Sequence, residues 1–103
     1  MLKKLPVIFI IDCSGSMEGD NIEVVNSSLI SIVKALKDLR TVDVCLSIIG
    51  FSTESQIILD SASLNSKIPI LEANGKTNFS EAIKSLQKLL ERASSRYGFF
   101  PEI

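Results

Sequence analysis

The sequence predicts an α/β domain in which a small, partly parallel sheet is covered by helices. Three observations lead to this fold class: an apolar run at Leu5–Ile11, a helical pattern from about Asn21 to Leu39, and a second apolar run at Val42–Phe51. A strand, a crossover helix and a strand form a unit whose two strands pair in parallel. With 103 residues, the chain is expected to form a single domain spanning residues 1–103.

The first strand and helix are the clearest elements. Leu5–Ile11 is rich in Val and Ile without a polar interruption, which is typical of a strand buried on both faces. Asp20 is expected to cap the following helix, with Glu23 completing a capping box. Apolar residues then recur at helical spacing through Asn21–Leu39, namely Ile22, Val25, Leu29, Ile32, Val33, Leu36 and Leu39.

The next two strands are expected to form a hairpin. Val42–Phe51 alternates at first and then becomes apolar on both sides, and Gln56–Leu59 follows after a short turn. The turn is too short for a parallel crossover, so the third strand should pair antiparallel with the second at the edge of the sheet. Residues 62–73 are ambiguous. Because Pro69 breaks a long helix, a short helical turn and a loop are expected there.

The last regular element is a helix from about Phe79 to Ser95, which Asn78 and Glu81 are expected to cap. Residues 96–103 show no clear periodicity, and an irregular tail is expected. The predicted order is therefore β-α-β-β-(short α)-α, with the first two strands parallel and an antiparallel third strand at the edge.

Composition excludes several classes of function. The chain has no histidine, which removes the commonest general base and zinc ligand, so an enzyme is not expected. The net charge is −1 without a basic stripe, which argues against nucleic-acid binding. Two cysteines do not form a disulfide framework, and Asp12 should raise the pKa of the Cys13 thiol. The apolar run Leu5–Ile11 is too short for a membrane span or a signal peptide, so a cytoplasmic location is expected.

Two polar loops are predicted at one rim of the sheet. Asp12, Ser14 and Ser16 follow the first strand, and Thr77 precedes the last helix. Ligands of open α/β sheets bind beyond the carboxyl ends of the strands. Carboxylate and hydroxyl oxygens suit a hard divalent cation, with Mg²⁺ preferred over Mn²⁺ or Ca²⁺. In the alternative interpretation, these side chains only cap the following helices or their own backbone.

This pattern resembles the von Willebrand factor A (VWA) family and its metal-ion-dependent adhesion site (MIDAS). The resemblance extends from Lys4 to about Ser95, and it is strongest for stand-alone bacterial members such as those encoded with tellurite-resistance genes. It implies a partial Rossmann-like fold in which Asp12, Ser14, Ser16 and Thr77 match the family's metal ligands.

The sequence departs from the family pattern toward its end. Typical members are longer, and a later strand supplies a further metal-site Asp that no residue here matches. The sequence therefore resembles a short or truncated member that lacks the C-terminal half. In the family, that later strand pairs beside the first strand, so the edge of Leu5–Ile11 would be bare. We expect a second copy of the chain, the Tyr97–Ile103 tail or a partner strand to cover it, with homodimerisation preferred.

The resemblance implies a protein-interaction module. A partner's acidic residue would complete the shell of a divalent cation bound by a partial site, whose occupancy the sequence leaves open. The alternative is a metal-free structural or assembly protein that associates through the edge of the first strand. A metal-assisted hydrolase is least favoured, because the sequence offers no base or second metal to activate water.

Overall fold

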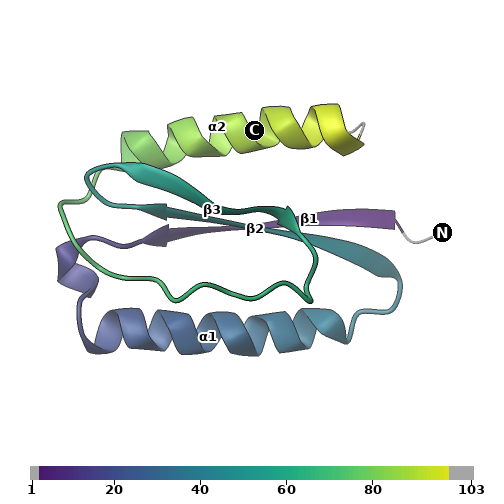
Figure 1. Cartoon of the computed structure of the whole chain (residues 1–103), viewed down its shortest axis with the longest axis horizontal. Helices are drawn as coiled ribbons and strands as arrows, with labels where there is room; N and C mark the ends of the chain where they lie inside the picture. Colours follow the sequence, from purple (N-terminus) through teal and green to yellow (C-terminus); the bar gives the residue numbers. More distant parts are fainter. Residues whose placement is uncertain (1–2, 98–103) are drawn as a thin grey trace.

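The computed structural model describes residues 3–97 and shows a sheet between two helices (Figure 1). Its elements, in chain order, are β1 (Lys3–Asp12), a 3₁₀ turn η1 (Gly15–Met17), α1 (Asp20–Lys37), β2 (Val42–Phe51), β3 (Ser55–Ala62) and α2 (Phe79–Tyr97). Helix α1 lies along one face of the sheet and α2 along the other. The predicted α/β class is confirmed.

The sheet has the order β1-β2-β3. Strands β1 and β2 pair in parallel, from Lys3 opposite Val42 to Asp12 opposite Phe51, and β3 pairs antiparallel with β2. Both pairings agree with the expected topology. Strand β3 is longer than the expected Gln56–Leu59. An irregularity in the β2–β3 register lets it continue, and the Ser61 amide donates a hydrogen bond of 2.8 Å to Ser47 Oγ.

Strand β2 forms the centre of the core. Leu46, Ile48 and Ile49 are completely buried, because β2 has a strand on each side and a helix over each face. On the α1 side, Leu46 and Ile48 belong to one apolar cluster with Ile22, Leu29 and Val33 of the helix. On the α2 side, the Phe51 ring lies 5.0 Å from the Phe79 ring.

Strand β1 is less buried than its sequence predicts. None of its ten residues is fully buried, and Leu5 and Ile10 are 38% and 41% exposed. Two features explain the difference. Within the described residues β1 is an edge strand of the sheet, and α2 packs against β2 and β3 rather than β1. The prediction of a strand buried on both faces is therefore wrong for the described chain.

The start of α1 also differs from its prediction. Asp20 is the first helical residue and not the cap, which is Gly19 with φ 81° and no side-chain hydrogen bond. The amide of Glu23 donates to the Gly19 carbonyl over 3.2 Å, so the backbone of Gly19 opens the helix. Asp20 and Glu23 instead place negative charge in the first turn, where the helix dipole favours it. The helix ends at Lys37, two residues before the expected Leu39.

The segment between β3 and α2 contains no helix, contrary to the expected short helical turn. Only one hydrogen-bonded turn forms, from the Ser66 amide to the Ser63 carbonyl over 3.0 Å, and the chain then runs irregularly along α1 (Figure 1). The Asn26 side chain of α1 holds this segment. It donates to the Leu71 carbonyl over 3.0 Å and accepts from the Leu71 amide over 2.8 Å. Tertiary hydrogen bonds thus replace the local ones of a helix.

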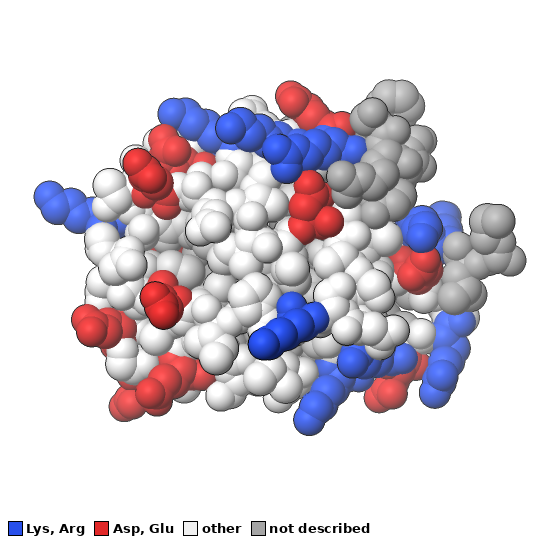
Figure 2. Space-filling view, viewed as in Figure 1, with Lys and Arg blue, Asp and Glu red and all other residues white. Residues whose placement is uncertain are grey.

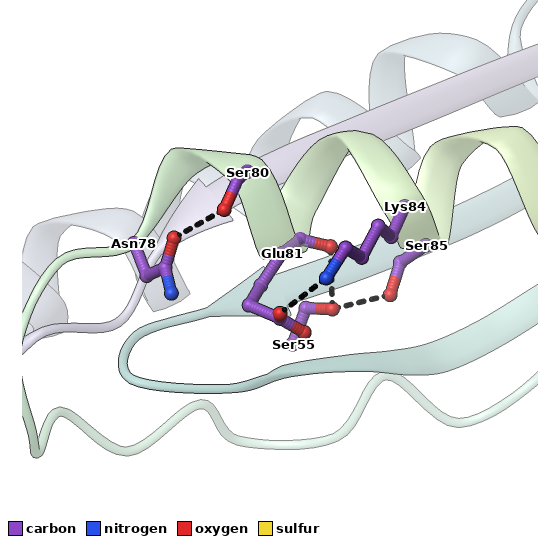
Figure 3. A network of polar contacts seen from close by, with 6 residues as sticks. All are labelled: Ser55, Asn78, Ser80, Glu81, Lys84 and Ser85. Atoms are coloured by element: carbon purple, nitrogen blue, oxygen red, sulfur yellow. Dashed lines mark hydrogen bonds and ion pairs between the residues drawn. The ribbon is translucent and has the colours of Figure 1, made fainter.

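Helix α2 is fixed to the β2–β3 hairpin by a small polar network (Figure 3). The Ser55 hydroxyl, at the start of β3, donates to the Glu81 carbonyl over 2.7 Å and also contacts the Ser85 hydroxyl. The Glu81 carboxylate pairs with Lys84 over 3.1 Å. Asn78 Oδ1 accepts a hydrogen bond from the Ser80 hydroxyl over 2.7 Å. The Asn78 and Glu81 side chains, which the sequence predicts to form a capping box, therefore bond to Ser80 and Lys84 instead.

The second helix is two residues longer than predicted, because Arg96 and Tyr97 belong to α2 rather than to an irregular tail. No proline or glycine interrupts the helix before Gly98, so the pattern continues to that point. The remainder of the predicted tail, residues 98–103, lies outside the described residues.

The Asn26 contacts predict a measurable contribution to stability. Asn26→Ala removes two hydrogen bonds to Leu71 and should lower the free energy of unfolding by about 1–2 kcal/mol, after a small gain in helix propensity. Urea denaturation measures the change. Ser28→Ala, an exposed position on the same helix, is the control and should shift stability by less than about 0.5 kcal/mol. Equal stability of wild type and Asn26→Ala would contradict the interpretation.

Candidate metal centre

The first polar loop begins where β1 ends. The Cys13 amide donates to the Phe51 carbonyl over 2.7 Å, which extends the contact with β2 by one residue before the loop turns away. The Asp12 carboxylate then accepts a hydrogen bond of 2.8 Å from the Ser14 amide. Ser14 is 2% exposed, and its hydroxyl lies 3.0 Å from that of Ser16. Three of the four predicted ligands therefore lie on one tight turn.

Backbone hydrogen bonds attach the second polar loop to the first. The Asn74 amide donates to the Cys13 carbonyl, and the Gly15 amide donates to the Gly75 carbonyl, each over 2.8 Å. The two loops therefore meet at one rim of the sheet, as their sequence positions predict. Thr77, the fourth predicted ligand, lies two residues after Gly75 and is exposed to solvent.

A third loop, residues 52–54, joins this group, although its sequence predicts only a short turn. The Lys76 amide donates to Thr53 Oγ1 over 2.9 Å, which connects the second polar loop to the turn between β2 and β3. Thr53 follows the carboxyl end of β2 just as Asp12 follows that of β1. The rule that ligands bind beyond the carboxyl ends of strands places Asp12 at the rim, and it could also have found Thr53. Thr53 positions the loop that contains Thr77.

Gly75 allows this close approach. Its φ of 76° lies in the left-handed region, and a Cβ atom there would come within 2.8 Å of Thr53 Oγ1. Both the backbone angle and the space therefore require glycine. The same residue presents the carbonyl that Gly15 contacts, so it determines how the two polar loops fit together.

The Cys13 thiol lies beneath the loop and is buried. Burial raises its pKa above the ordinary value of 9.0, and the adjacent Asp12 carboxylate raises it further, while a backbone hydrogen bond at Phe51 opposes both effects. The predicted effect of Asp12 on the Cys13 thiol is confirmed. A neutral, buried thiol is a poor nucleophile and a poor ligand, so the chemistry of the loop rests on oxygen atoms.

The oxygen atoms of the four candidate ligands suit a hard cation, but together they carry only one negative charge. Asp12 offers one carboxylate, and Ser14, Ser16 and Thr77 offer hydroxyl oxygens, all of which suit Mg²⁺, Mn²⁺ or Ca²⁺. Within residues 3–97, His, Cys, Asp and Glu side chains form no group of three that could hold a metal. Any cation at this rim would therefore depend on hydroxyls and water for most of its ligands.

Charge is unevenly distributed along the molecule. On the face shown in Figure 2, acidic side chains predominate at the end where the loops lie, and basic side chains are more frequent toward the opposite end. Helix α1 follows this pattern, with Asp20 and Glu23 in its first turn and Lys34 and Lys37 in its last. The negative potential at the loop end favours the approach of cations.

The family follows from comparison with known proteins. The family model described as von Willebrand factor type A domain matches residues 7–98. The chain belongs to this family. VWA domains commonly serve as protein-interaction modules, and many bind a divalent cation. The match includes both polar loops and most of the described fold.

A solved structure supports the same fold. The D319A mutant of the PilB minor pilin from Streptococcus sanguinis is similar to this VWA chain, with a TM-score of 0.72 and 19% sequence identity. The similarity covers 89% of this chain but 27% of the pilin chain, so this chain spans about a quarter of that protein. A search of curated proteins found no match. None of the helices within residues 3–97 is long and apolar enough to cross a membrane.

Gly75 provides a test of how the loops are joined. Gly75→Ala adds a Cβ within 2.8 Å of Thr53 Oγ1 at a φ of 76°, and we expect it to cost about 2–3 kcal/mol of unfolding free energy. Thr53→Ala in the Gly75→Ala background is the control, because it removes the oxygen that the added Cβ would approach. Thr53→Ala should therefore cost less unfolding free energy in that background than in the wild type. Equal costs of Thr53→Ala in the two backgrounds, measured by urea denaturation, would show that the close approach is unimportant.

The Cys13 thiol predicts a dependence of stability on alkaline pH. Because its folded pKa is above the unfolded value, its contribution is complete below pH 9.0 and is lost as the pH rises through the folded pKa. Wild type should therefore lose more unfolding free energy than Cys13→Ala as the pH is raised above 9.0. Parallel urea denaturations across that range measure the difference. Identical pH profiles of the two proteins would contradict a raised pKa of the Cys13 thiol in the folded protein.

Proposed function

We propose that this VWA chain is a protein-interaction domain whose binding depends on a divalent cation. Asp12, Ser14, Ser16 and Thr77 would hold the cation, and an acidic side chain of the partner would complete its shell. Mg²⁺ is the preferred ion, with Mn²⁺ and Ca²⁺ as alternatives. When bound, the cation supplies a positive charge with an open coordination position. The four residues of the chain would hold the cation at the rim.

The observation that carries this proposal is the connection between the two polar loops. Four backbone groups of residues 13–15 and 74–75 exchange hydrogen bonds of 2.8 Å at the carboxyl end of β1. The turn that Asp12 forms with Ser14 brings the Ser14 and Ser16 hydroxyls within 3.0 Å of each other. Such preorganised oxygen atoms lower the entropy cost of holding an ion.

The single carboxylate implies weak binding of the cation alone. Mg²⁺ holds its water shell tightly, and one negative charge compensates little of the cost of removing that water. A partner carboxylate would add a second charge, so partner and cation should each strengthen the binding of the other. The acidic end of the molecule would repel an acidic partner in the absence of the cation, which adds specificity.

A second candidate function is metal-free assembly through the edge of β1. The exposure of Leu5 and Ile10 favours it, because apolar side chains on an edge strand promote pairing with another strand. Both candidates are binding functions without catalysis. We also retain a cytoplasmic location as a prediction.

Cation binding is tested with the metal alone. We expect isothermal titration calorimetry with Mn²⁺ and Mg²⁺ to give weak, saturable binding to the wild type, with a Kd of about 1 mM or tighter. Asp12→Ala should abolish the binding, because it removes the only carboxylate of the site. Ser14→Ala should weaken it about tenfold through the loss of one ligand.

Two control variants separate the site from general charge effects. Asp38→Ala, at the end of α1, and Ser28→Ala, on its surface, should bind the cation like the wild type. Equal binding by wild type and Asp12→Ala, or no binding of either Mn²⁺ or Mg²⁺, would overturn the proposal. The metal-free candidate would then be favoured.

A further inference from the structure

We infer that a cavity between the β2–β3 hairpin and residues 69–74 receives an arginine side chain of the protein partner. The cavity has a volume of about 470 Å³, which lies within the range of ligand sites in proteins. This assignment rests on the proposed interaction function, because it names the chemistry of a side chain that the partner would contribute. Three features support it: the fixed walls of the cavity, its position beside the rim, and the charge of its lining.

Hydrogen bonds fix the walls of the cavity. One wall is the β2–β3 hairpin, and the other is the segment 69–74, which is anchored at two points. The Asn26 side chain bonds to the Leu71 carbonyl and amide over 3.0 and 2.8 Å, and the Asn74 amide donates to the Cys13 carbonyl over 2.8 Å. A site whose walls are already held loses little entropy when a ligand fills it.

The cavity adjoins the rim with the candidate cation site. Each of the three loops at the rim contributes to its lining, through Cys13, Ser52 and Asn74. Cys13 stands between the candidate ligands Asp12 and Ser14 in the sequence. A partner whose acidic side chain completed the shell of a cation would therefore lie next to the cavity, and one partner segment could reach both.

The cavity is independent of the edge of β1. Apart from Cys13, its lining comes from residues 50–58 and 69–74, which belong to the hairpin and to the segment after β3. Strand β3 lies at the opposite end of the sheet order from β1. A strand that paired beside β1, as in longer members of the family, would not occupy the cavity.

The charge of the lining favours a cation. Among the described residues that line the cavity, the only charged side chains are Glu54, in the turn between β2 and β3, and Glu72, on the other wall. Both residues are exposed to solvent. Within residues 3–97, neither carboxylate forms a hydrogen bond or an ion pair. Two carboxylates at one cavity without a positive neighbour attract a positively charged group.

The rest of the lining favours arginine over a compact cation. Ile58, Pro69 and Ile70 line the same cavity, and Ile70 is 83% exposed. The apolar stem of an arginine can cover such side chains while its head reaches the carboxylates. The guanidinium group has several N–H donors in one plane and is more weakly hydrated than an ammonium group. Gln56 and Asn74 add side-chain carbonyl oxygens as further acceptors.

A small probe tests the cavity directly. N-acetyl-L-arginine amide is titrated into the full ¹⁵N-labelled chain in EDTA at low salt, and the amide signals are followed by NMR. We expect saturable shifts at Gly50, Leu71 and Asn74, which line the cavity, with a Kd of about 1 mM. The amide of Lys34, in the last turn of α1, should not shift.

Two further probes separate the guanidinium group from general features of the probe. N-acetyl-L-citrulline amide has nearly the same shape without the charge and should bind about tenfold more weakly. N-acetyl-L-lysine amide keeps the charge without the planar group of donors and should bind about threefold more weakly. Equal binding of either analogue and the arginine probe would overturn the assignment of arginine.

Charge variants test the two carboxylates. Glu54→Gln and Glu72→Gln should each weaken binding of the arginine probe about threefold, because each removes one charge and keeps the size of the side chain. Glu18→Gln is the matched control: Glu18 is an exposed glutamate that follows the first polar loop but does not line the cavity. It should bind the probe like the wild type. Circular dichroism verifies that each variant is folded. Unchanged binding by both cavity variants, or equal weakening by Glu18→Gln, would overturn the inference.

EDTA separates this test from that of the cation site. Binding of the arginine probe in EDTA, together with no binding of Mn²⁺ or Mg²⁺, would support the cavity inference and overturn the cation proposal. Cation binding without a response to the arginine probe would do the reverse.

Discussion

The structure depends on the complete burial of β2. This strand is the only element of the described chain with a strand on both sides and a helix over each face. Its buried residues hold α1 on one side through Leu46 and Ile48, and Phe51 contacts α2 on the other. The parallel register with β2 then places Asp12 opposite Phe51, so the rim with the polar loops lies directly above the core.

The loops at the rim are held by backbone hydrogen bonds more than by side chains. Residues 13–15 and 74–75 bond to each other, and Gly75 has the backbone angle and the lack of a side chain that this contact requires. Side-chain oxygens add to these contacts: Thr53 accepts the Lys76 amide, and the Ser14 and Ser16 hydroxyls contact each other. The Asp12 carboxylate also accepts the Ser14 amide. Asp12 could accept this hydrogen bond and bind a cation at the same time, because a carboxylate has two oxygens and several lone pairs.

Local pattern was sufficient for the sheet order, both strand pairings and the meeting of the two polar loops at one rim, because hydrophobic periodicity and βαβ geometry determine these features. It was insufficient wherever a distant residue decides the outcome. Residues 62–73 form no helix, since Asn26 of α1 bonds to Leu71 instead. Thr53 supports the second loop through Lys76, a contact between residues far apart in the sequence. The exposure of β1 depends on which neighbours cover it, and apolar composition cannot specify that.

Asp12 connects the fold to the proposed binding function. It ends β1 opposite Phe51, and its carboxylate accepts the Ser14 amide that shapes the turn. The same carboxylate would supply the only negative charge of the candidate cation site, so the site alone compensates little of the cost of removing water from a cation. Because an acidic side chain of the partner would supply the second charge, cation and partner would bind together, and by linkage each would strengthen the binding of the other by the same factor.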